Sequence, residues 1–182
     1  GPPGRRSAAF ARAGIGPDTF VLALDEGDLE AVVRSALERH GIEAGLLELE
    51  LTESLLSDSH AVVQATLEHI RRMGVSLAID DFGTGYSSLA YLRRMPIDKI
   101  KIDRSFVMDM AGNDSDMMIV KTMIKLAHGL GKRILAEGVE TAVQLELLRN
   151  MSCDAVQGYY IAKPLAEQDA LALVKKPTMP LS

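Results

Sequence analysis

Acidic and basic side chains stand at the ends of several short apolar runs in this sequence. Glu50 lies in LLELELTES, Asp80 and Asp81 close SLAIDD, Lys101 lies in DKIKIDRSF, and Glu137 ends RILAE. In a parallel α/β barrel, apolar strands fill the core and functional side chains gather at the C-terminal ends of the strands. We therefore interpret these five residues as members of one site.

The four acids of this set predict a metal site. Carboxylates crowded at one sheet edge repel one another, and a divalent cation removes that cost. Oxygen ligands select hard ions, so Mg²⁺ or Mn²⁺ is expected rather than Zn²⁺. The four histidines (40, 60, 69 and 128) show no ligand-like spacing. A pair of hard metal ions beside such acids is typical of phosphodiester hydrolysis, in which the metals activate water.

Lys101 has three interpretations. Its ammonium group can orient water or stabilise developing charge. A lysine in a barrel can also form a Schiff base with a carbonyl substrate, which would indicate a lyase. The structural alternative is an ion pair with Asp103 or another neighbouring acid. The metal-type acids favour the first interpretation.

A glycine-containing loop, DDFGTGYSSL, follows the two aspartates. Gly83 and Gly85 permit a tight loop that gates the site or forms an interface. Glu53 follows Glu50 by three residues and is expected to hydrogen-bond the loop. Gln157 ends the last predicted strand, and Tyr159 and Tyr160 beside it serve either base contact or packing.

The composition is that of a globular domain with a sizeable core, with 47% hydrophobic and 25% charged residues among 182. The formal net charge of −5 gives no electrostatic support to DNA binding. Cys153, the single cysteine, excludes an internal disulfide and is expected to be a small buried residue rather than a nucleophile. No membrane segment or signal peptide is expected, and the cytoplasm is the expected location.

Apolar periodicity predicts strands that alternate with helices. The expected strands are 46–51, 75–80, 97–103, 133–137 and 154–157, with a doubtful one at 19–24. The expected helices are one that starts at Leu29 and ends before Gly41, 62–73 capped by Asp58, 87–95, 114–129, 141–150 with a Thr141–Gln144 capping box, and 166–175. Such alternation gives a parallel sheet. The acids ahead of the glycine loop favour a closed barrel over an open doubly wound sheet, although a complete barrel has about 250 residues.

Five motifs together resemble the EAL family of cyclic di-GMP phosphodiesterases. They are ELTES (50–54), DDFGTGYSSL (80–89), KIDRSFV (101–107), EGVET (137–141) and QGYY (157–160), in the family's order and spacing. The resemblance implies a modified TIM-type (β/α) barrel and cleavage of cyclic di-GMP to linear pGpG with Mg²⁺ or Mn²⁺. It divides the chain into an irregular segment (1–18), a partial EAL domain (19–176) and a tail (177–182).

The resemblance also implies a role for individual residues. Glu50, Asp80 and Asp81 are the expected metal ligands, and Lys101 and Glu137 hold the hydrolytic water, with Glu137 as the base. Gln157 and Asp103 belong to the substrate pocket. A further group is expected to couple metal binding to dimerisation; it comprises Glu53, Phe82, Gly83, Gly85 and Glu140.

The family motif Glu-Ala/Val-Leu with its following Arg has no counterpart in this sequence. We therefore expect an EAL domain truncated on its N-terminal side, with weak or absent hydrolysis by this chain alone. The alternative is a catalytically inactive module that binds cyclic di-GMP or a protein partner. A homodimer is expected, with upstream sensory or GGDEF-type domains in the full-length protein.

Overall fold

The computed structural model describes residues 29–53, 61–85, 89–165 and 169. Its described strands form one sheet in the order β1-β2-β3-β4-β5. The chain divides into two compact units, which are described separately. The first contains residues 29–50, 61–77, 165 and 169, and the second contains residues 51–53, 78–85 and 89–164.

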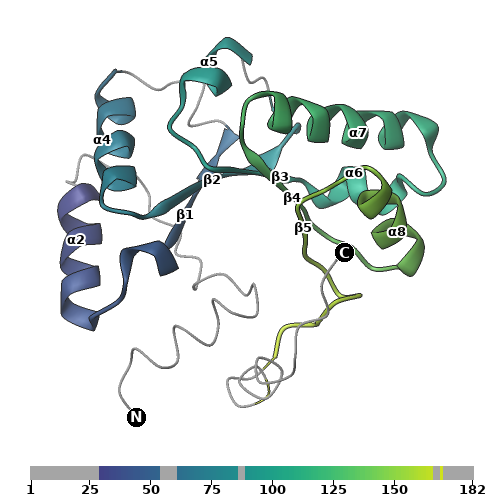
Figure 1. Ribbon diagram of the computed structural model, residues 1–182. Helices are drawn as coiled ribbons and strands as arrows, with labels where there is room; N and C mark the ends of the chain where they lie inside the picture. Colours follow the sequence, from purple (N-terminus) through teal and green to yellow (C-terminus); the bar gives the residue numbers. More distant parts are fainter. Residues whose placement is uncertain (1–28, 54–60, 86–88, 166–168, 170–182) are drawn as a thin grey trace. The chain divides into compact units, whose positions relative to one another are not determined.

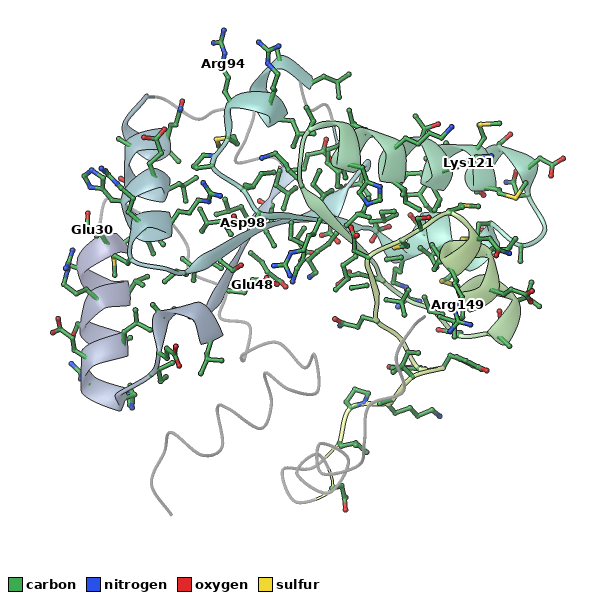
Figure 2. The ribbon with its side chains drawn as sticks, in the orientation of Figure 1. Glu30, Glu48, Arg94, Asp98, Lys121 and Arg149 are labelled. Atoms are coloured by element: carbon green, nitrogen blue, oxygen red, sulfur yellow. The ribbon has the colours of Figure 1, made fainter. Side chains whose placement is uncertain are left out.

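The first unit is built around two packed helices. Helices α2 (Leu29–His40) and α4 (Ala61–Arg72) contact each other. Glu30 of α2, labelled in Figure 2, pairs with the Nδ1 atom of His69 on α4 at 3.0 Å. A short 3₁₀ helix, η1 (Ala44–Leu46), leads into β1 (Glu48–Thr52). The Ser76 amide at the start of β2 (Ser76–Phe82) donates to the Leu47 carbonyl at 3.0 Å, which joins the two strand beginnings.

The second unit alternates strands and helices (Figure 1). After β2, its elements are α5 (Leu89–Arg94), β3 (Lys99–Ile102), α6 (Arg104–Asp109), α7 (Asp114–Gly129), β4 (Arg133–Ala136), α8 (Ala142–Asn150) and β5 (Ala155–Val156). The pairs β2–β3, β3–β4 and β4–β5 are all parallel. Their C-terminal ends therefore share one edge of the sheet.

Alternation along the strands builds the core of the second unit. Ile100 pairs with Ile134 and Ile102 with Ala136 in the β3–β4 register, and all four are buried. Helix α7 packs on both strands. It contributes its own buried stripe, Val120, Ile124 and Ala127, at helical spacing. Lys121, labelled in Figure 2, lies on the exposed face of the same helix.

The predicted α/β alternation and the parallel pairing are confirmed, and several boundaries differ. The strand expected from residue 46 begins at Glu48, because η1 occupies the residues before it. The strand expected at 97–103 is limited to Lys99–Ile102. Helix α6 (Arg104–Asp109) was not predicted, because Asp103 was interpreted as the end of a strand and not as a helix cap. The expected strand 19–24, the Asp58 cap, the segment 1–18 and the tail 177–182 lie outside the described residues, as does the expected helix 166–175 apart from residue 169.

Close backbone packing joins the loops after β4 and β5. The Gln157 amide donates to the Ala136 carbonyl at 2.8 Å, and the Val139 amide donates to the Gln157 carbonyl at 3.0 Å. A Cβ atom on Gly158 would lie 2.2 Å from the Val139 oxygen. Because backbone cannot move aside as a side chain can, a glycine is required for this approach. The loop that carries Glu137 is thereby fixed against the loop that carries Gln157.

The Gly158 contact gives a stability prediction. Gly158→Ala forces its methyl group into the Val139 backbone, and overpacking of this kind costs about 1–3 kcal/mol. We expect a lower midpoint in urea unfolding followed by circular dichroism. Gly112→Ala is the matched control, because a Cβ there meets nothing within 4 Å. Equal midpoints for both variants would show that the loops are not packed this closely.

Candidate active site

A bulge in β2 brings two consecutive aspartates to the same edge. Between the pairs Ile79–Ile100 and Phe82–Ile102, β2 advances by three residues while β3 advances by two. Successive residues of a regular strand point to opposite faces, and one extra residue breaks that alternation. Asp81 has the left-handed φ of 52° that the bulge requires. Asp80 and Asp81 can therefore both offer oxygen atoms to one site.

Lys101 joins the ends of three neighbouring strands. Its Nζ atom lies 2.8 Å from Asp80 Oδ1 and 2.9 Å from Glu137 Oε1. Asp80 comes from β2, Lys101 from β3 and Glu137 from the first position after β4. The lysine side chain is 7% exposed, against 25% for Asp80 and 20% for Glu137. A partly desolvated ammonium group between two carboxylates holds all three in fixed positions.

Asp80, Asp81 and Glu137 form a cluster that could hold a metal ion. Each offers a carboxylate oxygen, and these oxygens lie within 4.8 Å of one another. Asp80 Oδ1 is buried, and its contact is the ion pair with the Lys101 ammonium at 2.8 Å, with no hydrogen bond assigned to it. A buried oxygen of this kind has spare capacity as a ligand. The donor set is all oxygen, which suits Mg²⁺, Mn²⁺ or Ca²⁺.

Asp81 and Asp103 are hydrogen-bonded carboxyl groups whose pKa values are shifted in opposite directions. Burial raises the pKa of Asp81, and the nearby charges of Asp80 and Asp103 raise it further. Burial also acts to raise the pKa of Asp103, but hydrogen bonds from the Ser105 hydroxyl and amide outweigh it, and the pKa falls. Of the two carboxyl groups, Asp81 is therefore the one that takes up a proton more readily. A bound cation would take the place of that proton.

Glu53 anchors the glycine loop. Its side chain is buried, with 5% of the residue exposed, and Oε2 accepts hydrogen bonds from the amides of Gly83 and Gly85, each at 3.0 Å. Gly83 has a φ of 103°, and a Cβ there would lie 2.2 Å from Met123 Cε. Phe82, the last residue of β2, is buried in the core. The expected hydrogen bonding between Glu53 and this loop is thus present.

The other predicted residues lie in separate positions. Gln157 is exposed directly after β5, and Glu140 is exposed in the loop after β4. Glu50 is half-buried within β1, at the last residue of the first unit. Asp103 has a function that the sequence reading missed, because its side chain accepts from the Ser105 amide at 3.0 Å and caps helix α6. The pattern Asp-x-Ser ahead of an apolar run is a signal that would have indicated this cap.

The structure also tests the interpretation of Cys153. Its thiol is half-buried and lies 3.2 Å from the carbonyl of Ala155. Burial raises the pKa of Cys153 to about 11. The thiolate needed for nucleophilic chemistry is therefore scarce near neutral pH, as expected for a structural cysteine.

Comparison with known proteins places this geometry in a family. Residues 19–164 match the family model described as the EAL domain. The chain belongs to the EAL domain family. The cyclic di-GMP phosphodiesterase NbdA of Pseudomonas aeruginosa is 50% identical over 142 residues, which are 78% of this chain and 18% of NbdA. The bifunctional diguanylate cyclase/cyclic di-GMP phosphodiesterase MucR of the same organism is 43% identical over 142 residues, 78% of this chain and 21% of MucR.

Solved EAL structures share the fold of this EAL domain. The phosphodiesterase of MucR in complex with cyclic di-GMP aligns with a TM-score of 0.78 and 39% identity, over 90% of this chain and 69% of that one. The manganese/cyclic di-GMP complex of Klebsiella pneumoniae BlrP1 aligns with a TM-score of 0.70 and 28% identity, over 85% and 41%. These neighbours confirm the predicted TIM-type class. The chain spans about a fifth of the length of the two curated relatives.

The Glu53 anchor gives a local prediction for this EAL domain. Glu53→Ala leaves the amides of Gly83 and Gly85 without their acceptor, which costs about 1–3 kcal/mol for a part-buried donor. We expect faster hydrogen exchange at these two amides. Glu53→Gln is the control, because its amide oxygen still accepts, and it should protect both glycines better than alanine does. Unchanged exchange in the alanine variant would contradict the anchor.

The Cys153 thiol gives a pH prediction. With a pKa of about 11, about one thiol in a thousand is ionised at pH 8, and labelling by a disulfide reagent should be at least about tenfold slower than for an ordinary thiol once the higher nucleophilicity of its thiolate is included. Because the folded pKa is raised, the rate should climb with each pH unit up to pH 10. Labelling in guanidinium chloride provides the unfolded control. Equal rates in folded and unfolded protein would contradict the shift.

Proposed function

We propose that this EAL domain belongs to a cyclic di-GMP phosphodiesterase and that its described site residues act on the phosphodiester of that ligand. The observation that carries the proposal is the ammonium of Lys101 held between Asp80 and Glu137, with Asp81 beside them. The named activity of NbdA and the ligand in the MucR complex support the substrate. Because the chain spans only about a fifth of the length of NbdA and MucR, the activity of the whole protein is also a proposal.

Glu50, Asp80 and Asp81 are the proposed ligands of Mg²⁺ or Mn²⁺. Solved complexes of BlrP1 contain calcium or manganese together with cyclic di-GMP, which supports a divalent cation. Bound in this position, the metal would supply a nucleophilic water and hold the phosphate oxygens in line. The buried oxygen of Asp80 and the raised pKa of Asp81 both support a site that is completed by a cation.

The protein's own residues would direct the hydrolysis. Glu137 accepts the proton of the attacking water as its oxygen bonds to phosphorus. The bond between phosphorus and the ribose oxygen of the ring breaks, and the leaving oxygen takes up a proton, which gives linear pGpG. Lys101 keeps Glu137 in place and stabilises negative charge that develops on the phosphate. Gln157 and Asp103 contribute to the pocket.

Several expectations accompany this proposal. A group of five residues would couple the site to a homodimer: Glu53, Phe82, Gly83, Gly85 and Glu140. The hydrogen bonds from the glycine loop to Glu53 are the contacts through which this coupling would act.

Among the described residues, no helix has the length and apolar character needed to cross a lipid bilayer. A cytoplasmic location, upstream sensory or GGDEF-type domains and weak hydrolysis by this chain alone stay predictions.

Substitution at the ion-pair centre tests the proposal. In the full-length protein, we expect Lys101→Met to lower turnover of cyclic di-GMP with Mn²⁺ by about 10²–10³-fold, because an electrostatic stabiliser is lost. Glu137→Gln should lower it by about 10²–10⁴-fold, since an amide cannot accept the proton. Lys121→Met and Glu146→Gln are matched controls on exposed positions of α7 and α8. Turnover is followed by chromatography of pGpG, with circular dichroism to confirm folding.

Other outcomes would reject the proposed chemistry. Calorimetry can measure the affinity for cyclic di-GMP with and without Mg²⁺. Equal affinities in a protein that shows no turnover would indicate the inactive binding module. Borohydride trapping of a carbonyl substrate on Lys101 would indicate the Schiff-base lyase. Turnover of the two site variants at the level of their controls would show that the cluster does not carry the reaction.

A further inference from the structure

Gln144 is a buried polar residue for which neither the proposed chemistry nor the predicted site set gives a role. It lies in the first turn of α8 and is 4% exposed. Its Oε1 atom accepts hydrogen bonds from the amides of Glu140 at 2.8 Å and Thr141 at 2.9 Å. Its Nε2 atom donates to the carbonyls of Val107 at 3.2 Å and Met108 at 3.0 Å.

These four bonds connect two separate segments of the second unit. Glu140 and Thr141 end the loop that begins with Glu137 after β4. Val107 and Met108 lie in the last turn of α6, which follows β3 through Asp103. The sequence reading identified Gln144 as part of a capping box with Thr141, and the box is present. The bonds to α6 add a second function, since capping alone does not need Nε2 to reach another helix.

We call these four hydrogen bonds of Gln144 the clamp, and only a primary amide side chain can form all of them. An amide side chain offers two N–H donors and one oxygen with two lone pairs. Gln144 directs both donors to one segment and both lone pairs to the other. A carboxylate could accept but not donate, and a thioether of similar shape could do neither well. Burial raises the cost of each bond that is lost.

The clamped segments also contact each other near the site. The Glu137 amide donates to the Ile102 carbonyl at 3.2 Å. A Cβ atom on Gly138 would lie 2.6 Å from the Cβ of Arg104, the first residue of α6. The loop with Glu137 is thus held against α6 at its start by packing and at its end by Gln144. Between these two supports the loop has little freedom to move Glu137 away from Lys101.

We infer that Gln144 is a positioning residue that sets Glu137 relative to Lys101 by tying the loop after β4 to helix α6. Its effect on turnover rests on the proposed phosphodiesterase function, while its structural coupling does not. Outer residues that orient a metal or base site commonly change activity by about 10–100-fold when they are replaced. Loss of the clamp should therefore lower kcat and leave KM within about twofold, since no substrate contact is removed.

Three variants of the full chain separate positioning from simple destabilisation. Gln144→Met removes all four bonds at similar volume. Gln144→Glu keeps the acceptor for Glu140 and Thr141 but places a carboxylate against the carbonyls of α6. Leu148→Ala, on the same helix, removes a fully buried side chain without touching the clamp and serves as the stability control. Kinetics with cyclic di-GMP and Mn²⁺ are normalised to the folded fraction from circular dichroism.

Hydrogen exchange provides a readout that needs neither metal nor turnover. In Gln144→Met, the amides of Glu140 and Thr141 and those of 106–110 should all exchange at least about tenfold faster, in excess of any global loss of stability. In Gln144→Glu, the amides of Glu140 and Thr141 should keep their protection while those of 106–110 lose it. Leu148→Ala should show neither selective pattern and should keep kcat per folded molecule.

The outcomes distinguish the two proposals. An inactive wild-type chain that does not bind Mn²⁺ would count against the proposed function, and the exchange pattern would still decide whether Gln144 couples the two segments. If Gln144→Met does not speed exchange at these amides beyond the global loss of stability, Gln144 does not tie the two segments together. If Leu148→Ala lowers kcat per folded molecule as much as Gln144→Met does, the loss reflects stability, and Gln144 has no positioning role.

Discussion

The arrangement of the second unit depends on one ammonium group between two carboxylates. Lys101 reaches Asp80 and Glu137 from the central strand of three, and it is nearly buried there. Ion pairs removed from water cost desolvation energy, and apolar residues of similar size often stabilise a core as well or better. This desolvation cost is consistent with the catalytic role proposed for Lys101, since stability alone does not require the ion pair. An ion pair at the ends of parallel strands is where a barrel protein places reacting groups.

The loops around this centre are held mainly by backbone contacts. Glu53 accepts from two glycine amides, Gly158 lies against the Val139 backbone, and Gly138 lies against Arg104. The Gly158 contact has few alternative arrangements, because the facing Val139 atoms belong to the backbone and cannot move aside as a side chain can. The site residues consequently sit on short, fixed connections. Such rigidity is what electrostatic catalysis requires of its charged groups.

Much of this organisation follows from the pattern of residues. Alternation of apolar strands and amphipathic helices predicted the parallel sheet, and acids at strand ends predicted the cluster of Asp80, Asp81 and Glu137. The bulge escaped the sequence reading, because one extra residue leaves no mark on a run as short as SLAIDD. Helix α6 was missed because Asp103 reads equally well as a strand end and as a helix cap. The reach of Gln144 to α6 depends on contacts distant in sequence, which local patterns do not contain.

The bulge also restricts how the segment can change in length. Side chains alternate between the two faces of a strand, so the number of residues between Ile79 and Phe82 decides which way each one points. With the extra residue of the bulge, Ile79 and Phe82 both enter the core, and Asp80 and Asp81 both lie at the site. Deleting one residue would restore regular alternation and leave a single acid at the edge. Adding one would also restore the alternation, but it would shift Phe82 out of its register with Ile102 of β3. Natural and engineered versions of this sheet should therefore accept indels beyond Gly85 far more readily than before it.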